Sequence, residues 1–186
     1  MQAKNKNITQ MKTLLSGQKP KLIIFTAVNR KKSMESLTKQ ELELLRILQQ
    51  NSRFDINQLT DKLNMSRSSV YDRIKKLENE GYITNYVALV DPKKVGLNFT
   101  VIVNVSLVSQ RYDYVEEFSR QIALLDEVVD AYVTAGIVDY VLRVVVKDPE
   151  AFNNFIATKL AAIPNVSKVQ SSFVMGCIKQ STVLPF

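Results

Sequence analysis

The stretch from Asp55 to Tyr86 constrains the fold more than any other part of this chain. Its sequence is DINQLTDKLNMSRSSVYDRIKKLENEGYITNY. The spacing of apolar residues predicts a helix, a tight turn at Asn64-Met65, a second helix that ends at Gly81, and then a strand. The second helix has a cationic outer face. Two helices joined in this way are typical of proteins that insert one helix into the major groove of DNA.

A further helix is predicted just before this pair. Thr38 followed by Glu41 has the spacing of a capping box, and the helix should run to about Gln50. Asp55 with Gln58 gives a second start signal, and Ser66 is the predicted N-cap of the third helix. The positions expected to face the core of this domain are Leu42, Leu45, Leu48, Leu59, Leu63, Val70, Ile74 and Leu77.

The third helix has two kinds of exposed position: some are expected to contact DNA bases, and others are expected to contact phosphates. Base contacts come from the N-terminal part of a recognition helix, which favours Ser68, Ser69 and Asp72 as readers of base edges. Tyr71 could stack on a sugar or touch a thymine methyl group. Glu41 is expected to lie away from this face. Cationic side chains that more often meet phosphates are Arg67, Arg73, Lys75 and Lys76. The predicted DNA-binding set is Ser66, Arg67, Ser68, Ser69, Tyr71, Asp72, Arg73, Lys75 and Lys76. The alternative is a solvated helix with ordinary surface charges.

The net charge of +7 does not describe the folded part of the chain. Residues 1–33 hold eight Lys and Arg and no acid, which gives +8. Residues 34–92 hold eight basic and nine acidic side chains, and residues 93–186 hold nine of each. These segments contribute −1 and 0, so a DNA-binding surface must come from local clustering of charge.

Residues 1–33 are expected to form a basic, flexible N-terminal extension. Their one apolar run, Leu22 to Val28, has seven residues, whereas a membrane-spanning helix needs about 20. No small-residue cleavage pattern follows the run, which argues against a signal peptide. Two interpretations remain open: an upstream start with Met34 as the natural first residue, or an arm that tracks along DNA.

Composition argues against metal and catalytic chemistry. The chain has no His, so the commonest metal ligand and general base is missing. Its one cysteine, Cys177, cannot form an intrachain disulfide, which fits a reducing cytoplasm. Cys177 is expected to be a small hydrophobic residue at a strand end, with a redox-sensing thiol as the alternative. We predict no catalytic residue, no cofactor and no metal site.

The second half of the chain predicts an α+β domain of the order βαββαβ. The expected strands are 99–108, 128–134, 140–146 and 166–175, and the expected helices are 112–124 and 150–162. This order is typical of a ferredoxin-like sheet with helices on one face. The other sheet face is left for a partner, and self-association is the natural way to cover it.

The predicted domain boundaries follow from these elements. Residues 34–85 form the helix-turn-helix domain, of the winged type, and residues 98–186 form the ferredoxin-like domain. Residues 86–97 connect them as a linker strand and turn. The strand expected at 82–90 could pair with its copy in a second subunit and set two DNA-reading heads apart.

Six motifs, in order and spacing, resemble the Lrp/AsnC family of leucine-responsive or feast/famine regulators. They are L-N-M-S at 63–66, D-R-I-K-K-L-E at 72–78, E-G-Y-I at 80–83, A-L-V-D-P at 88–92, G-I-V-D-Y-V-L at 136–142 and K-Q-S at 179–181. The resemblance covers residues 37–182. It implies a sequence-specific, DNA-binding transcriptional regulator that forms dimers, often assembled into octamers.

The resemblance also implies an effector, usually an amino acid, bound between dimers near the loop at Gly136. Asp139 keeps the second acid of the family's loop motif and is the candidate partner of an effector's ammonium group. The first acid and the aromatic of that motif are replaced by Ile137 and Val138. This leaves an apolar amino acid, an altered ligand or no effector. The implied effector-binding set is Thr134, Ala135, Gly136, Asp139, Ser172 and Val174.

Three other functions are compatible with the same residues. One is an architectural DNA-binding protein without an effector. Another is an enzyme on the same scaffold, similar to haem-pathway decarboxylases, although those rely on histidine and this chain has none. The third is an assembly module whose helix-turn-helix contacts only proteins.

Overall fold

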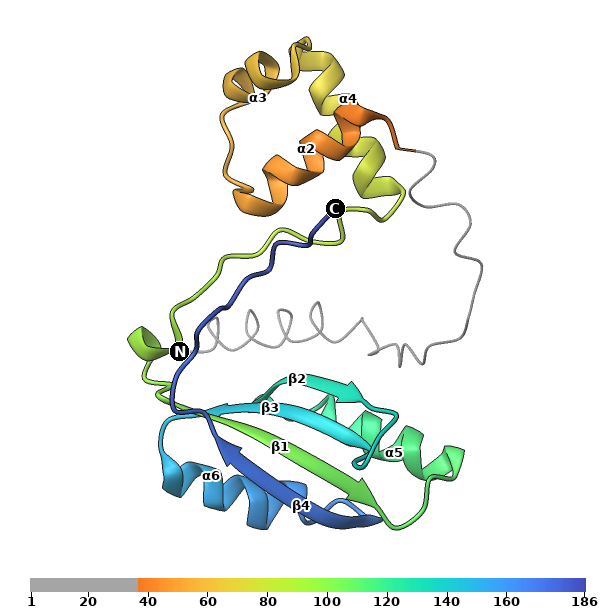
Figure 1. Ribbon diagram of the computed structural model, residues 1–186, viewed down its shortest axis with the longest axis vertical. Helices are drawn as coiled ribbons and strands as arrows, with labels where there is room; N and C mark the ends of the chain where they lie inside the picture. The colour runs from red at the N-terminus through yellow and green to blue at the C-terminus, as the bar shows by residue number, and fades with distance from the viewer. Residues whose placement is uncertain (1–36) are drawn as a thin grey trace, which may run out of the picture. The chain divides into compact units, whose positions relative to one another are not determined.

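The computed structural model describes residues 37–186, so the predictions for residues 1–33 and Met34 lie outside the described residues. Two compact units are present among them. One contains residues 37–90 together with Cys177–Phe186, and the other is Asp91–Gly176. We call the first the head and the second the sheet unit (Figure 1). The last ten residues differ from the predicted division, because they contact the head rather than the sheet unit.

The head contains the three predicted helices: α2 (Lys39–Gln50), α3 (Ile56–Leu63) and α4 (Arg67–Asn79). Each begins at the predicted cap. Thr38 and Glu41 form the reciprocal capping box, while the side chains of Asp55 and Ser66 accept backbone N–H bonds at α3 and α4. The turn between α3 and α4 is also confirmed, since Asn64 takes the left-handed conformation with φ of 50°.

The core of the head is a single apolar cluster contributed by all three helices. Its buried members are Leu44, Leu48, Leu59, Leu63, Val70, Ile74 and Leu77. The prediction for α2 was wrong in register, because Leu44 is buried while Leu42 and Leu45 are only half-buried. The inner stripe of α2 is Glu41, Leu44 and Leu48, which follows the i, i+3, i+7 spacing of one helix face.

The chain beyond α4 departs from the predicted strand. Within residues 37–98 no strand forms, so the strand expected at 82–90 is wrong for a single chain. A strand needs a neighbour to accept its backbone hydrogen bonds, and this segment has none among the described residues of one chain.

The sheet unit confirms the βαββαβ order. Its elements are a short 3₁₀ turn η2 (Pro92–Val95), β1 (Phe99–Leu107), α5 (Tyr112–Ile122), β2 (Val128–Val133), β3 (Tyr140–Val146), α6 (Pro149–Phe155) and β4 (Val166–Phe173). The sheet is antiparallel in the order β2-β3-β1-β4. The helix predicted at 150–162 is divided, because α6 continues into a π-helical turn, η3 (Ile156–Leu160).

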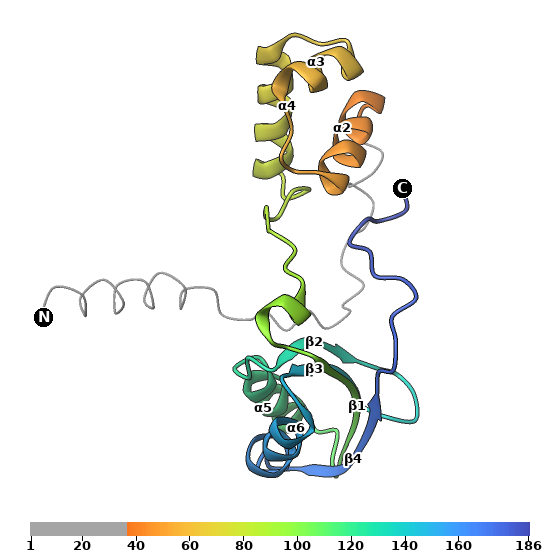
Figure 2. The same cartoon turned by 90° about the vertical axis from the view of Figure 1, so that its left-hand side faces the viewer.

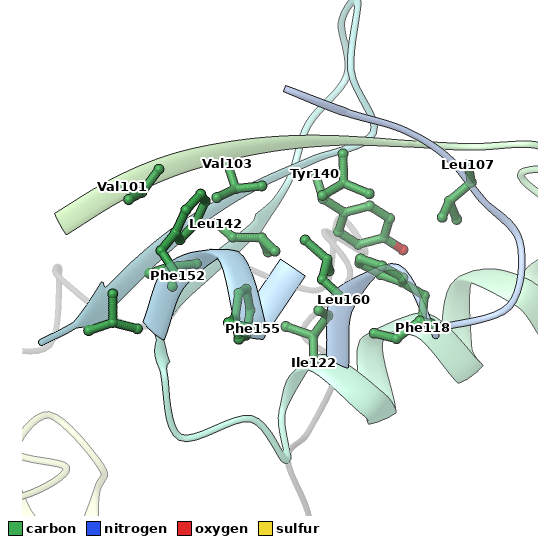
Figure 3. Close-up of a cluster of buried hydrophobic side chains, with 14 residues drawn as sticks. Val101, Val103, Leu107, Phe118, Ile122, Tyr140, Leu142, Phe152, Phe155 and Leu160 are labelled. Atoms are coloured by element: carbon green, nitrogen blue, oxygen red, sulfur yellow. The ribbon is translucent and has the colours of Figure 1, made fainter. Parts of the chain in front are cut away.

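The helices cover one face of this sheet, as Figures 1 and 2 show. Alternate residues of β1 point into the core, among them Val101 and Val103, and they share one buried cluster with Phe118 of α5 and Phe155 of α6 (Figure 3). Burying each such side chain contributes about 1.5–3 kcal/mol. The outward positions of β1 and β3, for example Ile102 and Arg143, belong to a sheet face without a covering helix. We call it the open face.

Candidate nucleic-acid interface

The outer surface of α4 presents the residues that the sequence pattern indicated. The exposed residues include Ser68, Tyr71, Asp72 and Lys75, and Tyr71 as a whole residue is 56% accessible. Val70 occupies the buried side of the same helix. Within the described part of the chain, neither Asp72 nor Lys75 has a hydrogen-bond or ion-pair partner. Both side chains are therefore available to an outside molecule.

Three serine hydroxyls gather at the N-terminus of α4. The Ser66 Oγ accepts the backbone N–H of Ser69 at 3.3 Å, and it lies 3.0 Å from the Oγ atoms of both Ser68 and Ser69. The N-terminal end of a helix is its positive end. Hydroxyl groups there suit a phosphate oxygen or the edge of a base.

Three of the four predicted phosphate-binding cations contact other residues of the head. Lys76 Nζ donates to Glu41 Oε1 at 2.8 Å, and Arg73 Nη1 lies 3.7 Å from the same oxygen. Arg73 also donates to Thr38 and to Gln40, while Arg67 donates to Asn57. The expectation that Glu41 lies away from α4 was therefore wrong.

Glu41 is the buried centre of this cluster, which we call the Glu41 clamp (Glu41, Thr38, Arg73 and Lys76). Only 2% of the residue is exposed. Burial raises the pKa of Glu41, but hydrogen bonds from Lys76 and from the backbone and hydroxyl of Thr38 outweigh it and lower that pKa to about 2. The hydrogen bond to Glu41 raises the pKa of Lys76. Opposite charges thus hold the start of α2 against the middle of α4.

The sequence pattern did not identify Glu41 as part of this surface. A glutamate at the third position of a helix is fully explained by the capping box. A usable signal was present, however. Glu41 lies three residues before the buried Leu44, on the same face of α2, and a charge on a core face needs a partner.

The loop predicted to bind an effector is held by Asp139. Its Oδ2 accepts the backbone N–H of Leu107 at 2.7 Å, and its Oδ1 accepts Gln110 Nε2 at 2.6 Å. Thr134 closes the loop by donating its hydroxyl to the carbonyl of Val138. Ile137 is fully exposed at the tip. The carboxylate has a role within its own chain, and its remaining lone pairs can accept one further donor.

The implied effector residues fall into two groups on one chain. Thr134, Ala135, Gly136 and Asp139 lie where β1 ends, since the Asp139 N–H donates to the carbonyl of Val105. Ser172 and Val174 lie at the opposite end of β1, where Ser172 pairs with Ile102 and the Val174 N–H donates to Thr100. One copy of the chain does not bring the two groups together.

Neither a metal site nor a membrane helix is found in residues 37–186. No group of His, Cys, Asp and Glu in this range could hold a metal ion. None of the helices in the same range has the length and apolar character that crossing a bilayer requires. Cys177 is exposed, so its prediction as a small hydrophobic residue at a strand end was wrong. The reason is that β4 ends at Phe173, before Cys177.

An apolar groove on the head was not predicted. Its volume is about 980 Å³, and it is lined by α2, the segment 82–89 and the residues Thr182, Leu184 and Phe186. Leu42 and Leu45, which the core does not bury, lie along its wall. The groove is contained within one unit.

Comparison with known families identifies both halves of the chain. A winged helix-turn-helix DNA-binding domain model matches residues 37–84, and the Lrp/AsnC ligand binding domain model matches residues 100–184. The chain is 32% identical to the Bkd operon transcriptional regulator of Pseudomonas aeruginosa over 152 residues, covering 82% of this chain and 99% of that protein. It is 30% identical to the leucine-responsive regulatory protein of Haemophilus influenzae, covering 83% and 93%.

Solved structures agree with these matches. A transcriptional regulator of Neisseria meningitidis, solved as its complex with L-Met, has a TM-score of 0.77 at 32% identity and covers 81% of this chain and 97% of its own. An AsnC family transcriptional regulator of Agrobacterium tumefaciens has a TM-score of 0.76 at 37% identity, covering 80% and 97%. These proteins are named as transcriptional regulators rather than as enzymes.

Proposed function

The chain belongs to the Lrp/AsnC family of DNA-binding transcriptional regulators, and from this premise we propose that α4 enters the major groove and reads base edges. The observation that carries the proposal is the exposed outer face of α4, on which the serine hydroxyls, Asp72 and Lys75 point away from the core. A helix held by caps and by the Glu41 clamp presents these groups in one fixed arrangement. Such preorganisation lowers the ordering cost of binding.

We assign different roles to the predicted DNA-binding residues. Ser68, Ser69 and Asp72 contact base edges, and Tyr71 contacts a sugar or a thymine methyl group. Ser66 orients the two serine hydroxyls. Lys75 binds a phosphate because it has no partner within the described residues. The main role of Arg67, Arg73 and Lys76 is to position α4. Their N–H groups that are not used within the head neutralise phosphates.

The open face supports a homodimer as the working form. Val141 on β3 is paired there with Tyr132 on β2 and Asn104 on β1, on the side of the sheet opposite the buried Val103 and Leu142. A second copy that packs on this face would be related by a twofold axis. Two copies of α4 would then address two half-sites about one helical turn, ~10 base pairs, apart. Octamers built from such dimers are a further proposal.

We propose an apolar amino acid as the effector. The relative from Neisseria meningitidis was solved with L-Met, and the loop here has the apolar Ile137 and Val138 beside Asp139. Because the two groups of effector residues lie at opposite ends of β1, a complete pocket requires residues from more than one copy. We place this regulator in the cytoplasm, where DNA and amino acids are both available.

Replacing Lys75 by alanine should weaken DNA binding equally for all sequences. The loss of one phosphate contact per head should reduce the slope of log K against log salt by about 1 per half-site. Thermal stability should not change, because Lys75 is exposed and forms no hydrogen bond or ion pair within residues 37–186. The measurement is fluorescence anisotropy at four salt concentrations, with Lys147→Ala in the sheet unit as the control. An unchanged salt slope would remove Lys75 from the interface.

Replacing Asp139 by asparagine should reduce sensitivity to the effector by about tenfold or more, because the ammonium group loses its counter-charge. DNA affinity without amino acid should stay within about twofold of the original. The test titrates L-Met and L-Leu into a DNA-bound complex and records the half-maximal concentration. Asp126→Asn, an exposed carboxylate outside the loop, is the control. Identical titrations for Asp139→Asn and the unaltered chain would show that Asp139 only holds the loop.

A further inference from the structure

The last ten residues, 177–186, which we call the tail, contact α2 of the head in a specific register. The Gln49 side chain forms two hydrogen bonds with the main chain of Leu184: Nε2 donates to the carbonyl at 3.1 Å, and Oε1 accepts the N–H at 2.9 Å. Arg46 Nε donates to the carbonyl of Phe186 at 2.8 Å. The Gln49 amide therefore pairs with the tail as a neighbouring strand would.

The apolar groove supports the same contact. Leu184 and Phe186 line it together with Leu42 and Leu45 of α2. Burial is nevertheless incomplete, since 66% of Leu184 and 36% of Phe186 remain exposed. A segment held by a few exposed hydrogen bonds and by half-buried apolar groups opens more readily than the core. The contact is specific in register, and its partial exposure is suited to reversible opening.

The chain passes between the head and the sheet unit twice. The head is joined to the sheet unit once by the linker before Asp91 and a second time by the tail after Gly176. We propose that the tail is a reversible strap, and that its seat is the main-chain-binding pair Arg46 and Gln49 together with the leucines of the groove. While the strap is seated, the head is connected to the sheet unit covalently by the linker and non-covalently by the hydrogen bonds and apolar contacts of the tail. When the strap is released, only the linker connects the head to the sheet unit.

The seated strap restricts the positions that a head can sample. The consequence for DNA binding rests on the proposed function, a dimer that binds two half-sites. Two heads with restricted freedom bind only half-sites at one spacing, whereas freer heads tolerate several spacings. The strap also starts four residues after Phe173, the last residue of β4, and three residues after Val174, near which an effector is proposed to bind. A ligand at that end of β4 is therefore connected to the seat by a short stretch of chain.

The experiment compares the unaltered chain with Gln49→Ala, with a chain shortened after Ser181, and with Gln58→Ala as a matched control. Gln58 is an exposed glutamine on α3 whose side chain forms no hydrogen bond among the described residues. Hydrogen–deuterium exchange of the tail is the first measurement. We expect at least tenfold faster exchange at Leu184 in Gln49→Ala than in Gln58→Ala. An unprotected Leu184 amide in the unaltered chain would overturn the proposal.

The second measurement is affinity for duplexes whose half-sites are at the preferred spacing or are moved apart by two base pairs. The unaltered chain and Gln58→Ala should lose at least tenfold in affinity on the altered spacing. Gln49→Ala and the shortened chain should lose less than threefold. Equal spacing dependence in all four proteins would overturn the strap. All four proteins should have the same affinity for a single half-site. If none of them binds a single half-site, the DNA-binding proposal is rejected instead of the strap.

Discussion

Replacing Glu41 by alanine is expected to destabilise the head by about 2–4 kcal/mol. The substitution removes half of the capping box at α2 and also the carboxylate that receives Lys76 at 2.8 Å. Both losses occur at one position that is 2% exposed, so water replaces neither interaction fully. Calorimetric unfolding of the full chain measures the effect.

Glu43→Ala is the matched control for this prediction. Glu43 lies two residues further along α2 and pairs with Arg46, but about half of each side chain is exposed. Exposed pairs contribute little, and we expect a change within about 0.5 kcal/mol. Similar losses from Glu41→Ala and Glu43→Ala would show that the buried clamp has no special role.

The dependence of stability on pH provides a second test of the clamp. The pKa of Glu41 in the folded head is about 2, below its ordinary value of 4.5. The folded state therefore binds fewer protons than the unfolded state between these values. The stabilisation that the ionised Glu41 carboxylate gives to the folded head is complete above about pH 5 and is lost as the pH falls toward 2. The free energy of unfolding is measured between pH 6 and pH 2. As the pH is lowered, it should fall less steeply in Glu41→Gln than in the unaltered chain. Parallel curves for the two proteins would contradict the lowered pKa of Glu41.

Replacing Val141 by glutamate is expected to convert the dimer to a monomer and to weaken binding to paired half-sites by about 100-fold or more. Val141 lies between Asn104 and Tyr132 on the open face, in the middle of the sheet. In a twofold interface the new carboxylate would appear twice, buried and unpaired, which costs several kcal/mol. A monomer retains one head, so it also loses the gain from binding two half-sites on one duplex.

Sedimentation velocity and DNA titration test this prediction together. Leu124→Glu introduces the same charge at an exposed leucine after α5, outside the sheet strands, and should leave both dimer and affinity intact. The proposal fails if the unaltered chain is a monomer at the concentrations that bind DNA. It also fails if Val141→Glu remains a dimer with full affinity.

The elements that the sequence predicted correctly are those defined by local rules. The caps at Thr38, Asp55 and Ser66 and the period-two pattern of β1 each involve residues close together in the chain, so their physics is visible in sequence order. The βαββαβ order followed from the same local signals.

The contacts that the sequence did not predict join residues that are distant in the chain. Glu41 and Lys76 are 35 residues apart, and Gln49 and Leu184 are 135 apart. No spacing rule connects such pairs, because their proximity is a product of the whole fold. The missing strand at 82–90 has a related cause. Extended backbone forms a strand only with a partner, and among the described residues of one chain none is supplied.

The most direct measurement of whether α4 reads DNA sequence is a ratio of two dissociation constants. The dissociation constant for a duplex selected from random DNA is compared with that for the same bases in shuffled order, at one fixed salt concentration. We predict that the selected duplex binds about 10³-fold more tightly or better. Equal affinities for the two duplexes would contradict the claim and would leave an architectural protein that binds DNA without reading its sequence.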